Sequence, residues 1–237
     1  MRSTSPPDFK SLKVAFLLLG DRNKASSRVR AYWIGEELET LGHQVSYHHT
    51  QHRRDYLRIL AVMMRHDVLI FQKQYSRYDI ALLRIVKRMG KRIFFDIDDA
   101  PSRVGSEISQ RNAATMMREA HGVFAGSHNL EALAQKAGGT VYFIPSGVRL
   151  DQYKMRDPSD TEQICLGWIG NGTHYVEDLT SILEAPLRSA AAQHNIRLKI
   201  VGACGEPKLV EVFGCIDGLT LDLVDQVDWS SPEAVSA

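Results

Sequence analysis

Short apolar runs alternate with amphipathic segments along almost the whole chain, and this alternation constrains the fold more than any other feature. The first run, residues 14–19, is short enough for a buried strand, and residues 28–41 then place apolar side chains on one helical face. Further strands are expected at 45–48, 68–71, 92–95, 123–125 and 141–144, with helices between them at 56–64, 80–89, 113–120 and 130–137. Such alternation is typical of a parallel sheet with helices on both faces. We therefore expect an α/β fold that begins with a Rossmann-like domain.

A proline and a glycine mark the end of this first domain, in the segment VYFIPSGVRLDQY at 141–153. Pro145 has no backbone N–H and should end the last strand, and Gly147 is expected to take the positive φ of a tight exit turn. Residues 151–162 are polar, which predicts a linker.

A second round of alternation follows the linker. It predicts strands at 165–169, 197–201 and 219–223, with helices at 175–192 and 207–213. Three strands are about half of a doubly wound domain. The expected organisation is a polar tail at 1–12, an N-terminal domain at 13–158 and an incomplete second Rossmann-like domain at 159–237.

Composition narrows the class of protein. The net charge of +1 argues against bulk binding of nucleic acid or of an acidic partner. Cys165, Cys204 and Cys215 are odd in number and lack metal-binding spacing, so we interpret them as reduced core residues of a cytosolic protein. The start is polar and no run is long enough to span a membrane, which predicts a cytoplasmic protein with at most peripheral contact with the inner membrane face.

Ligands of open α/β sheets bind beyond the carboxyl ends of the strands, so the loops there carry the candidate sites. The first loop, GDRNKASSRVR at 20–30, has one glycine and lacks the dinucleotide fingerprint. Ser26 or Ser27 can cap the next helix, and Arg28 and Arg30 add positive charge, which together predict an anion site. The alternative is that the serines only cap and the arginines are solvated.

Three carboxylates follow the strand at 92–95, in the segment FFDIDDAP. Carboxylates clustered at a strand exit bind cations, act as acid and base, or cap the following turn. Asp96 and Asp98 should point the same way if the strand continues, and Asp99 can cap. An active-site role and a structural turn both remain open.

The first turn of the second domain is GWIGNGTHY at 167–175. Gly170 and Gly172 permit close approach of backbone, so a helix starting near Thr173 can present N–H groups to a diphosphate. The alternative is a tight turn without a ligand. In the loop before it, Ser127 is expected to cap the helix at 130–137, with His128 exposed in its first turn.

Two further clusters have structural alternatives. His48, His49 and His52 lie close together without a carboxylate or cysteine partner, which favours a solvated turn over a metal site. The helix at 56–64 is amphipathic and flanked by arginines; packing on the sheet is the simpler interpretation, and contact with anionic lipid the alternative.

The segment IPSGVRLDQY at 144–153 resembles the Ile-Pro-Asn-Gly-Val-Asp-x-x-x-Phe signature that closes the N-terminal domain of GT-B glycosyltransferases of the retaining "group 1" class. The resemblance extends over about 13–229, with support at 96–99 and 165–172. It implies transfer of a sugar from a nucleotide-sugar to an acceptor, either a sugar or a lipid-linked sugar, without a cofactor or a metal ion. The chain departs from the family in lacking the Gly-Gly pair of the first loop and the Arg and Lys that hold the diphosphate.

The resemblance also implies roles for individual residues. Asp98 and Asp99 are the expected catalytic residues. Contacts with substrate are expected from Ser27, Arg28, Arg30, Asp96, Gly170, Asn171, Gly172 and Thr173.

Enzymes of this class grip the donor with two glutamates spaced Glu-x7-Glu in the later half of the second domain, and this sequence stops at Ala237, before that half. We therefore expect the chain alone to be incompetent in transfer, and its incomplete second sheet to favour a homo-oligomer through an unpaired edge. The alternative is a non-catalytic Rossmann-like binding or interaction module derived from such an enzyme.

Overall fold

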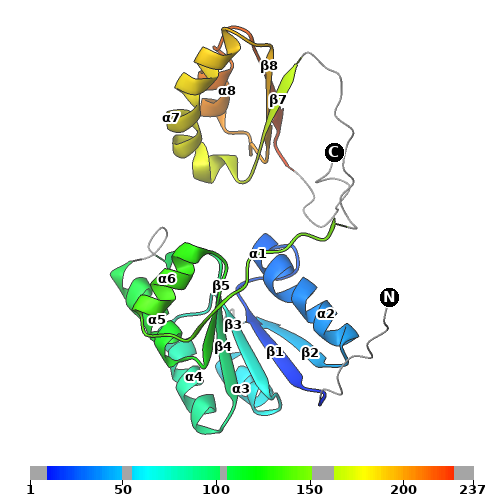
Figure 1. Cartoon of the computed structure of the whole chain (residues 1–237), viewed down its shortest axis with the longest axis vertical. Coiled ribbons are helices and arrows are strands. Elements are labelled where there is room, and N and C mark those ends of the chain that lie inside the picture. The colour runs from blue at the N-terminus through cyan, green and yellow to red at the C-terminus, as the bar shows by residue number, and fades with distance from the viewer. Residues whose placement is uncertain (1–9, 50–54, 102–105, 151–162, 227–237) are drawn as a thin grey trace, which may run out of the picture. The chain divides into compact units, whose positions relative to one another are not determined.

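The computed structural model describes residues 10–49, 55–101, 106–150 and 163–226 (Figure 1). The chain divides into two compact units, Met1–Val148 and Arg149–Ala237, which are described separately below. The linker expected at 151–162 lies outside the described residues.

The first unit contains a parallel sheet of six strands in the order β2-β1-β3-β4-β5-β6, which confirms the expected α/β class. Each predicted strand is present, with ends that differ by one or two residues. The strands are β1 (Lys13–Leu18), β2 (Gln44–His49), β3 (Val68–Gln72), β4 (Arg92–Ile97), β5 (Gly122–Ala125) and β6 (Val141–Phe143).

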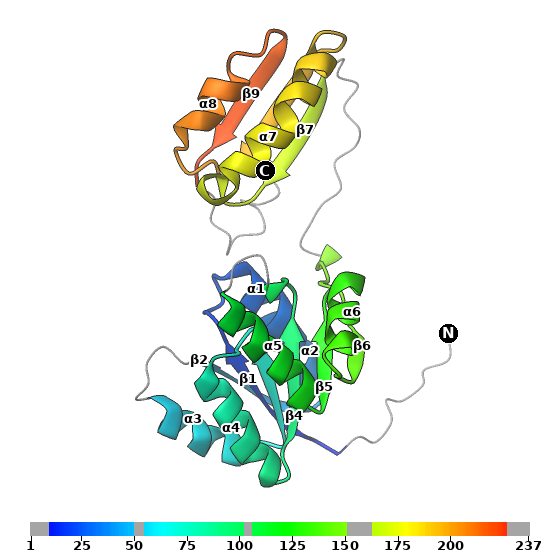
Figure 2. The same ribbon diagram turned by 90° about the vertical axis from the view of Figure 1, so that its left-hand side faces the viewer.

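Helices cover the two faces of this sheet unequally (Figure 2). One face packs against α3 (Asp55–Met64), α4 (Arg77–Arg88), α5 (Glu107–Glu119) and α6 (His128–Lys136). The other face packs against a single helical segment made of α1 (Ala25–Ser27), the π-helical turn η1 (Arg28–Tyr32) and α2 (Trp33–Thr40).

The alternation of side chains along each strand builds two cores. Leu17, Phe71 and Phe95 point into the four-helix side and are at most 2% exposed. Phe16 and Ile70 point the other way, toward Ala31. Central strands buried on both faces explain why their sequences are continuous apolar runs.

Capping side chains set where several helices begin. Ser76 and Asp79 form a reciprocal capping box, and α4 therefore starts three residues before the predicted position. Ser106 accepts from the Ser109 N–H and starts α5. Ser127 caps α6 as predicted. Gly42 and Gly90 have φ of +86° and +76° just after α2 and α4.

The first helix differs from its prediction. The cap expected from Ser26 or Ser27 is wrong, because the helix already begins at Ala25, after Lys24. Ser27 is fully buried, and its Oγ donates to Gln72 Oε1 at 3.3 Å. A π turn also interrupts the helix at Arg28–Tyr32, and it holds Arg30 inside the protein.

The expected positive φ of Gly147 is also wrong. Gly147 is not among the left-handed glycines, and a Cβ added there would meet nothing within 4 Å. The strand before it, β6, ends at Phe143, two residues ahead of Pro145.

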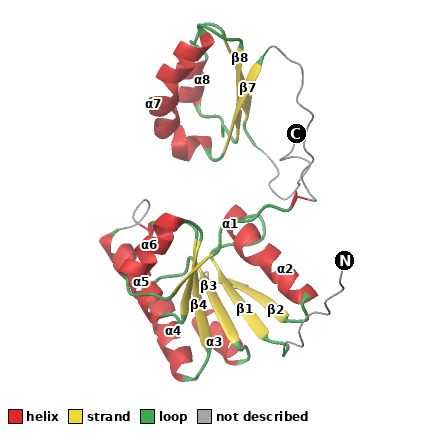
Figure 3. Cartoon of the chain, viewed as in Figure 1, coloured by secondary structure: helices red, strands yellow, loops and turns green. Residues whose placement is uncertain are grey.

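The second unit is a three-stranded parallel sheet in the order β7-β8-β9 (Figure 3). Its strands are β7 (Ile164–Ile169), β8 (Ile196–Val201) and β9 (Leu219–Val224), and its helices are α7 (Gly172–Ala191) and α8 (Pro207–Phe213). The helices pack on one face, over a core that includes Ile200 and Phe213.

The three cysteines are free, but all three are exposed, so the prediction that they are core residues is wrong. Cys165 and Cys204 lie in and beside strands of a sheet that is covered by helices on one face, and its other face leaves side chains open to solvent. No helix among the described residues combines the length and apolarity needed to cross a membrane.

Candidate functional site

The carboxyl ends of β1, β3 and β4 lie side by side in the first unit, since β3 pairs with both neighbours in parallel register. A pocket of about 500 Å³ opens at this edge of the sheet. It is lined by Leu19, Lys73, Gln74, Tyr75, Ser76, Arg77, Asp79, Ile108, Ser109 and Asn112. The position is the one where open α/β sheets bind ligands.

Lys73 connects this pocket to the predicted aspartates. Its ammonium lies 2.9 Å from Asp98 Oδ1 and also contacts Asp99 Oδ2. The backbone of Lys73 is left-handed, with φ of +54°, and its N–H donates to the carbonyl of Asp96 at 3.0 Å. Sequence reasoning missed this residue, although a lysine directly after the apolar strand VLIFQ was a usable signal.

Asp98 and Asp99 differ in exposure. The side chain of Asp98 is 16% exposed and that of Asp99 is 71% exposed. Burial alone would lower the pKa of Lys73, but its hydrogen bonds to Asp99 and Asp98 and their negative charge outweigh burial and raise that pKa. The ammonium is therefore charged at neutral pH.

Asp96 lies inside the protein and does not share the surroundings of Asp98. Asp96 and Asp98 were expected to point the same way if the strand continued, but β4 ends at Ile97 and the two carboxylates pair with different cations. Asp96 accepts from Arg30 Nε at 3.0 and 3.1 Å and from Arg30 Nη2 at 2.5 Å. The side chains of Arg30 and Asp96 are only 1% and 2% exposed.

Burial raises the pKa of Asp96 to about 6, and the hydrogen bonds and charge of Arg30 oppose a larger rise. Arg30 Nη1 also donates to the carbonyl of Ile144 at 2.6 Å. One guanidinium thus joins the helix after β1 to β4 and to the segment that follows β6.

Two glutamines complete the polar interior of this edge. Gln74 Nε2 donates to the Leu18 carbonyl at 2.6 Å and so ties the segment after β3 to the last residue of β1. Gln72 is fully buried and accepts from Ser27 through Oε1. Its Nε2 has no hydrogen-bond partner among the described residues.

The residues predicted to contact the substrate from the first loop differ in burial. Ser27, Arg30 and Asp96 are buried, so any effect on a ligand must pass through the residues they touch. Arg28 is half-buried, and its Nη1 donates to the carbonyls of Arg22 and Asn23.

In the second unit, the predicted turn lies between β7 and α7. Asn171 caps α7 by accepting from the His174 N–H at 2.9 Å, and the Gly172 N–H donates to the Gly202 carbonyl at 2.7 Å. Thr173 is exposed, and among the first three N–H groups of α7 only its own has no hydrogen bond within the described residues.

The glycines of this turn are required by packing. A Cβ on Gly172 would lie 2.5 Å from the Ala203 carbonyl oxygen, and one on Gly170 would lie 2.6 Å from the Trp168 ring. The close approach that these glycines permit is therefore made by other atoms of the protein, the Ala203 backbone and the Trp168 ring. Among the first three N–H groups of α7, only that of Thr173 is left without a hydrogen bond within the described residues.

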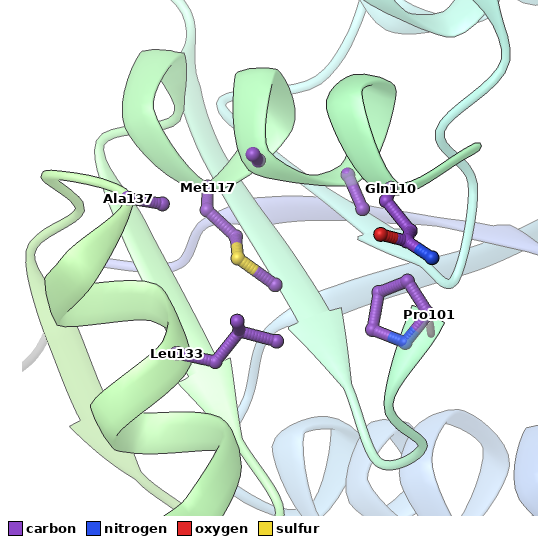
Figure 4. A pocket seen from close by; sticks show the side chains of 7 residues that line it. Pro101, Gln110, Met117, Leu133 and Ala137 are labelled. Carbon is purple, nitrogen blue, oxygen red and sulfur yellow. The ribbon is translucent and has the colours of Figure 1, made fainter. Parts of the chain in front are cut away.

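A second, smaller cavity of about 90 Å³ lies between α5 and α6. In Figure 4, Met117 extends from α5 toward Leu133 of α6, and Pro101 and Gln110 lie at the other end. Its lining is mostly apolar, and its volume is too small for a sugar nucleotide.

In the histidine segment, His48 is hydrogen-bonded, whereas Nδ1 of His49 is buried without a hydrogen-bond partner among the described residues. His48 Nε2 and His66 Nε2 lie 2.9 and 2.8 Å from Ser46 Oγ. Across the part of the chain that the structure describes, no three His, Cys, Asp or Glu side chains are grouped to hold a metal ion, and His52 lies outside that part.

Comparison with solved structures shows the fold. The complex of Anabaena Alr3699/HepE with UDP-glucose matches with a TM-score of 0.62 and 14% identity, over 92% of this chain and 70% of that chain. An alpha-glucosyltransferase in complex with UDP and a 13-mer DNA containing an HMU base matches with a TM-score of 0.59 and 13% identity, over 96% and 70%.

A putative UDP-N-acetylglucosamine 2-epimerase from Listeria monocytogenes also matches, with a TM-score of 0.52 and 12% identity, over 91% of this chain and 69% of that chain. No protein-family model matches the chain, and no curated protein matches it in sequence. The chain has the GT-B glycosyltransferase fold, which confirms the architecture that the segment 144–153 predicted. Because sequence identity is low, the similarity shows only the fold, and the reaction must be inferred from the residues of the site.

Proposed function

We propose that this protein binds a nucleotide-sugar and takes part in the transfer of its sugar to an acceptor hydroxyl. The observation that carries the proposal is that Lys73, which lines the 500 Å³ pocket of the first unit, forms ion pairs with Asp98 and Asp99. A carboxylate in this position can accept the proton of a hydroxyl group as that group attacks.

The lining of the pocket suits a sugar or a lipid-linked sugar as the acceptor. Leu19, Tyr75 and Ile108 supply apolar surface for the face of a sugar ring or for a linked apolar group. Ser109 and Asn112 supply hydroxyl and amide groups for hydrogen bonds with sugar hydroxyls.

The second unit supplies the donor side of the proposal. The exposed Thr173 N–H stands at the N-terminus of α7, where the helix dipole favours a diphosphate. Structures with a similar fold were solved with UDP-glucose or UDP bound, which supports a nucleotide-sugar as the ligand.

We further propose that this protein is cytoplasmic and makes peripheral contact with anionic lipid. Helix α3 supports the lipid contact. Leu57 is 81% exposed on this helix, and Arg58 lies next to it. An exposed apolar side chain beside a cation can contact the acyl chains and the headgroups of an anionic lipid surface at the same time.

Titration of the purified chain with UDP-glucose, followed by backbone amide NMR, tests the proposal. We expect saturable shifts at the N-terminus of α7. Thr173→Pro removes an N–H that has no hydrogen bond within the described residues, at a helix position that tolerates proline, and should weaken binding. Asn129→Pro makes the same change at the second position of α6 and serves as the matched control. No response to UDP-glucose, or equal affinity in both variants, would refute the donor assignment.

A further inference from the structure

Lys73 combines two features that a lysine in a loop seldom shows. Its backbone is left-handed, with φ of +54°, a conformation that is strained for a residue with a Cβ. Its side chain is only 15% exposed, although an ammonium is strongly hydrated in water. Strain of this kind persists only where the surroundings over-determine it, and it clusters at functional sites.

The surroundings of Lys73 show what fixes it. Its N–H is bound to the Asp96 carbonyl of the neighbouring strand, and the next residue, Gln74, is tied to the Leu18 carbonyl. These bonds direct the ammonium to the loop after β4, where it contacts one carboxylate oxygen of Asp98 and one of Asp99.

The Lys73 ammonium lies where a metal ion could bind to the two carboxylates. Two neighbouring carboxylates are the ligands that hard divalent cations such as Mg²⁺ and Mn²⁺ prefer, and such an ion would bind between their oxygens. The ammonium occupies that place with one positive charge and three N–H donors. It also balances part of a cluster in which Asp96, Asp98 and Asp99 face two cations, Arg30 and Lys73.

We infer that Lys73 is a built-in cation: it positions Asp98 and Asp99 at the pocket and fills the place that a divalent metal ion would otherwise take. Removing the ammonium should then create a weak divalent-cation site between the two carboxylates. The inference concerns the site of the proposed function, and its first test does not depend on sugar transfer.

The first test is a titration with Mn²⁺ followed by paramagnetic broadening of amide signals at residues 97–100. Lys73→Met should bind Mn²⁺ saturably, with a dissociation constant on the order of 1 mM as in weak carboxylate sites. The wild type and Lys73→Arg should show at least about tenfold weaker broadening there, since either cation still occupies the place.

Lys91→Met is the matched control, because Lys91 lies next to the opposite end of β4 and its ammonium donates to the Met64 carbonyl at 2.8 Å. If Lys73→Met does not fold, Lys73→Gly makes the same test, since glycine accepts the left-handed backbone. Equal Mn²⁺ broadening in the wild type, or none in either folded variant, would overturn the inference.

The second test uses turnover of UDP-glucose, followed as release of UDP. Lys73→Met should lose kcat with little change in KM, and millimolar Mn²⁺ should restore part of that loss. A merely structural lysine would not be replaced by a metal ion, so a loss that Mn²⁺ does not reverse would contradict the positioning role. If the wild type neither binds nor turns over UDP-glucose, the proposed function fails, while the Mn²⁺ titration still decides the inference.

Discussion

The guanidinium of Arg30 and the carboxylate of Asp96 form a three-bond ion pair inside the first unit, with both side chains almost fully removed from solvent. The two residues are 66 positions apart in the chain. Their contact joins the π turn of the first helix to β4, whose end carries Asp98 and Asp99. The pair therefore lies beneath the candidate site and supports it from within.

Breaking this pair on one side should be costly. Arg30→Met leaves the Asp96 carboxylate buried and the Ile144 carbonyl without its donor, and should lower the free energy of unfolding by about 3–5 kcal/mol. The double variant Arg30→Met with Asp96→Leu removes both charges and should recover much of that loss. Urea unfolding followed by circular dichroism measures both effects.

The control is Arg84→Met, which breaks the exposed pair between Arg84 and Glu119 and should leave the urea midpoint nearly unchanged. Equal losses for Arg84→Met and Arg30→Met would show that burial of the Arg30 pair does not matter.

The titration of Asp96 should run opposite to that of an ordinary salt-bridged aspartate. Burial raises its pKa from 3.8 to about 6, so the folded chain takes up this proton at a higher pH than the unfolded chain does. The preferential protonation of Asp96 in the folded chain then adds stability in full below about pH 4, and this added stability is lost as the pH rises through about 6. A carboxyl ¹³C titration between pH 4 and pH 8 measures the midpoint, and a midpoint below 4 would contradict this assignment.

Asp98 and Asp99 should matter for chemistry more than for stability. Asp98→Asn or Asp99→Asn should lower turnover of UDP-glucose by roughly 10²–10⁴, the usual contribution of acid–base catalysis. The melting temperature of Asp99→Asn should change little, because the Asp99 side chain is largely exposed, whereas the mostly buried Asp98 should cost somewhat more stability. Unchanged turnover in both variants would remove the active-site assignment.

The left-handed backbone of Lys73 predicts a difference between two variants that both lose the ammonium. Lys73→Gly relieves the strain of the positive φ, whereas Lys73→Met keeps it. The glycine variant should therefore be more stable than the methionine variant by about 1 kcal/mol. Thermal unfolding under identical conditions compares the two, and a less stable glycine variant would show that the conformation is not strained.

Two glycines should respond very differently to alanine. A Cβ on Gly202 would lie 2.0 Å from the Gly170 carbonyl oxygen, and its φ is +87°, so Gly202→Ala should destabilise the second unit by roughly 3 kcal/mol or more. Gly147→Ala should be nearly neutral because the space around Gly147 is open. Hydrogen exchange of amides in β7 and β8 would locate the loss in the first variant.

The sequence was sufficient for the order of strands and helices, because that order depends on local periodicity and caps. It also predicted Asp98 and Asp99 as site residues, since carboxylates at a strand exit are visible in one segment; their catalytic role stays a prediction. It did not identify Lys73, because the partner Asp99 lies 26 residues further along the chain. The two residues meet only because β4 pairs with β3 in the sheet.

Arg30 and Gly147 illustrate the other limits of local reasoning. A regular helix was assumed for Arg30, and the π turn that holds it inward has no local signature. Gly147 lies two residues after Pro145, which suggested a left-handed turn, but the strand had already ended at Phe143 and a Cβ on Gly147 would meet no atom within 4 Å.

The π turn at Arg28–Tyr32 has a consequence for the length of this segment. A π turn amounts to one residue inserted into an α-helix, and each residue of an α-helix turns the next side chain by about 100°. Deleting one residue between Arg28 and Tyr32 would convert the segment to a uniform α-helix. Either Arg30 or the apolar side chains of α2 would then rotate away from the sheet. The segment should therefore tolerate substitutions at its exposed positions and reject any change in its number of residues.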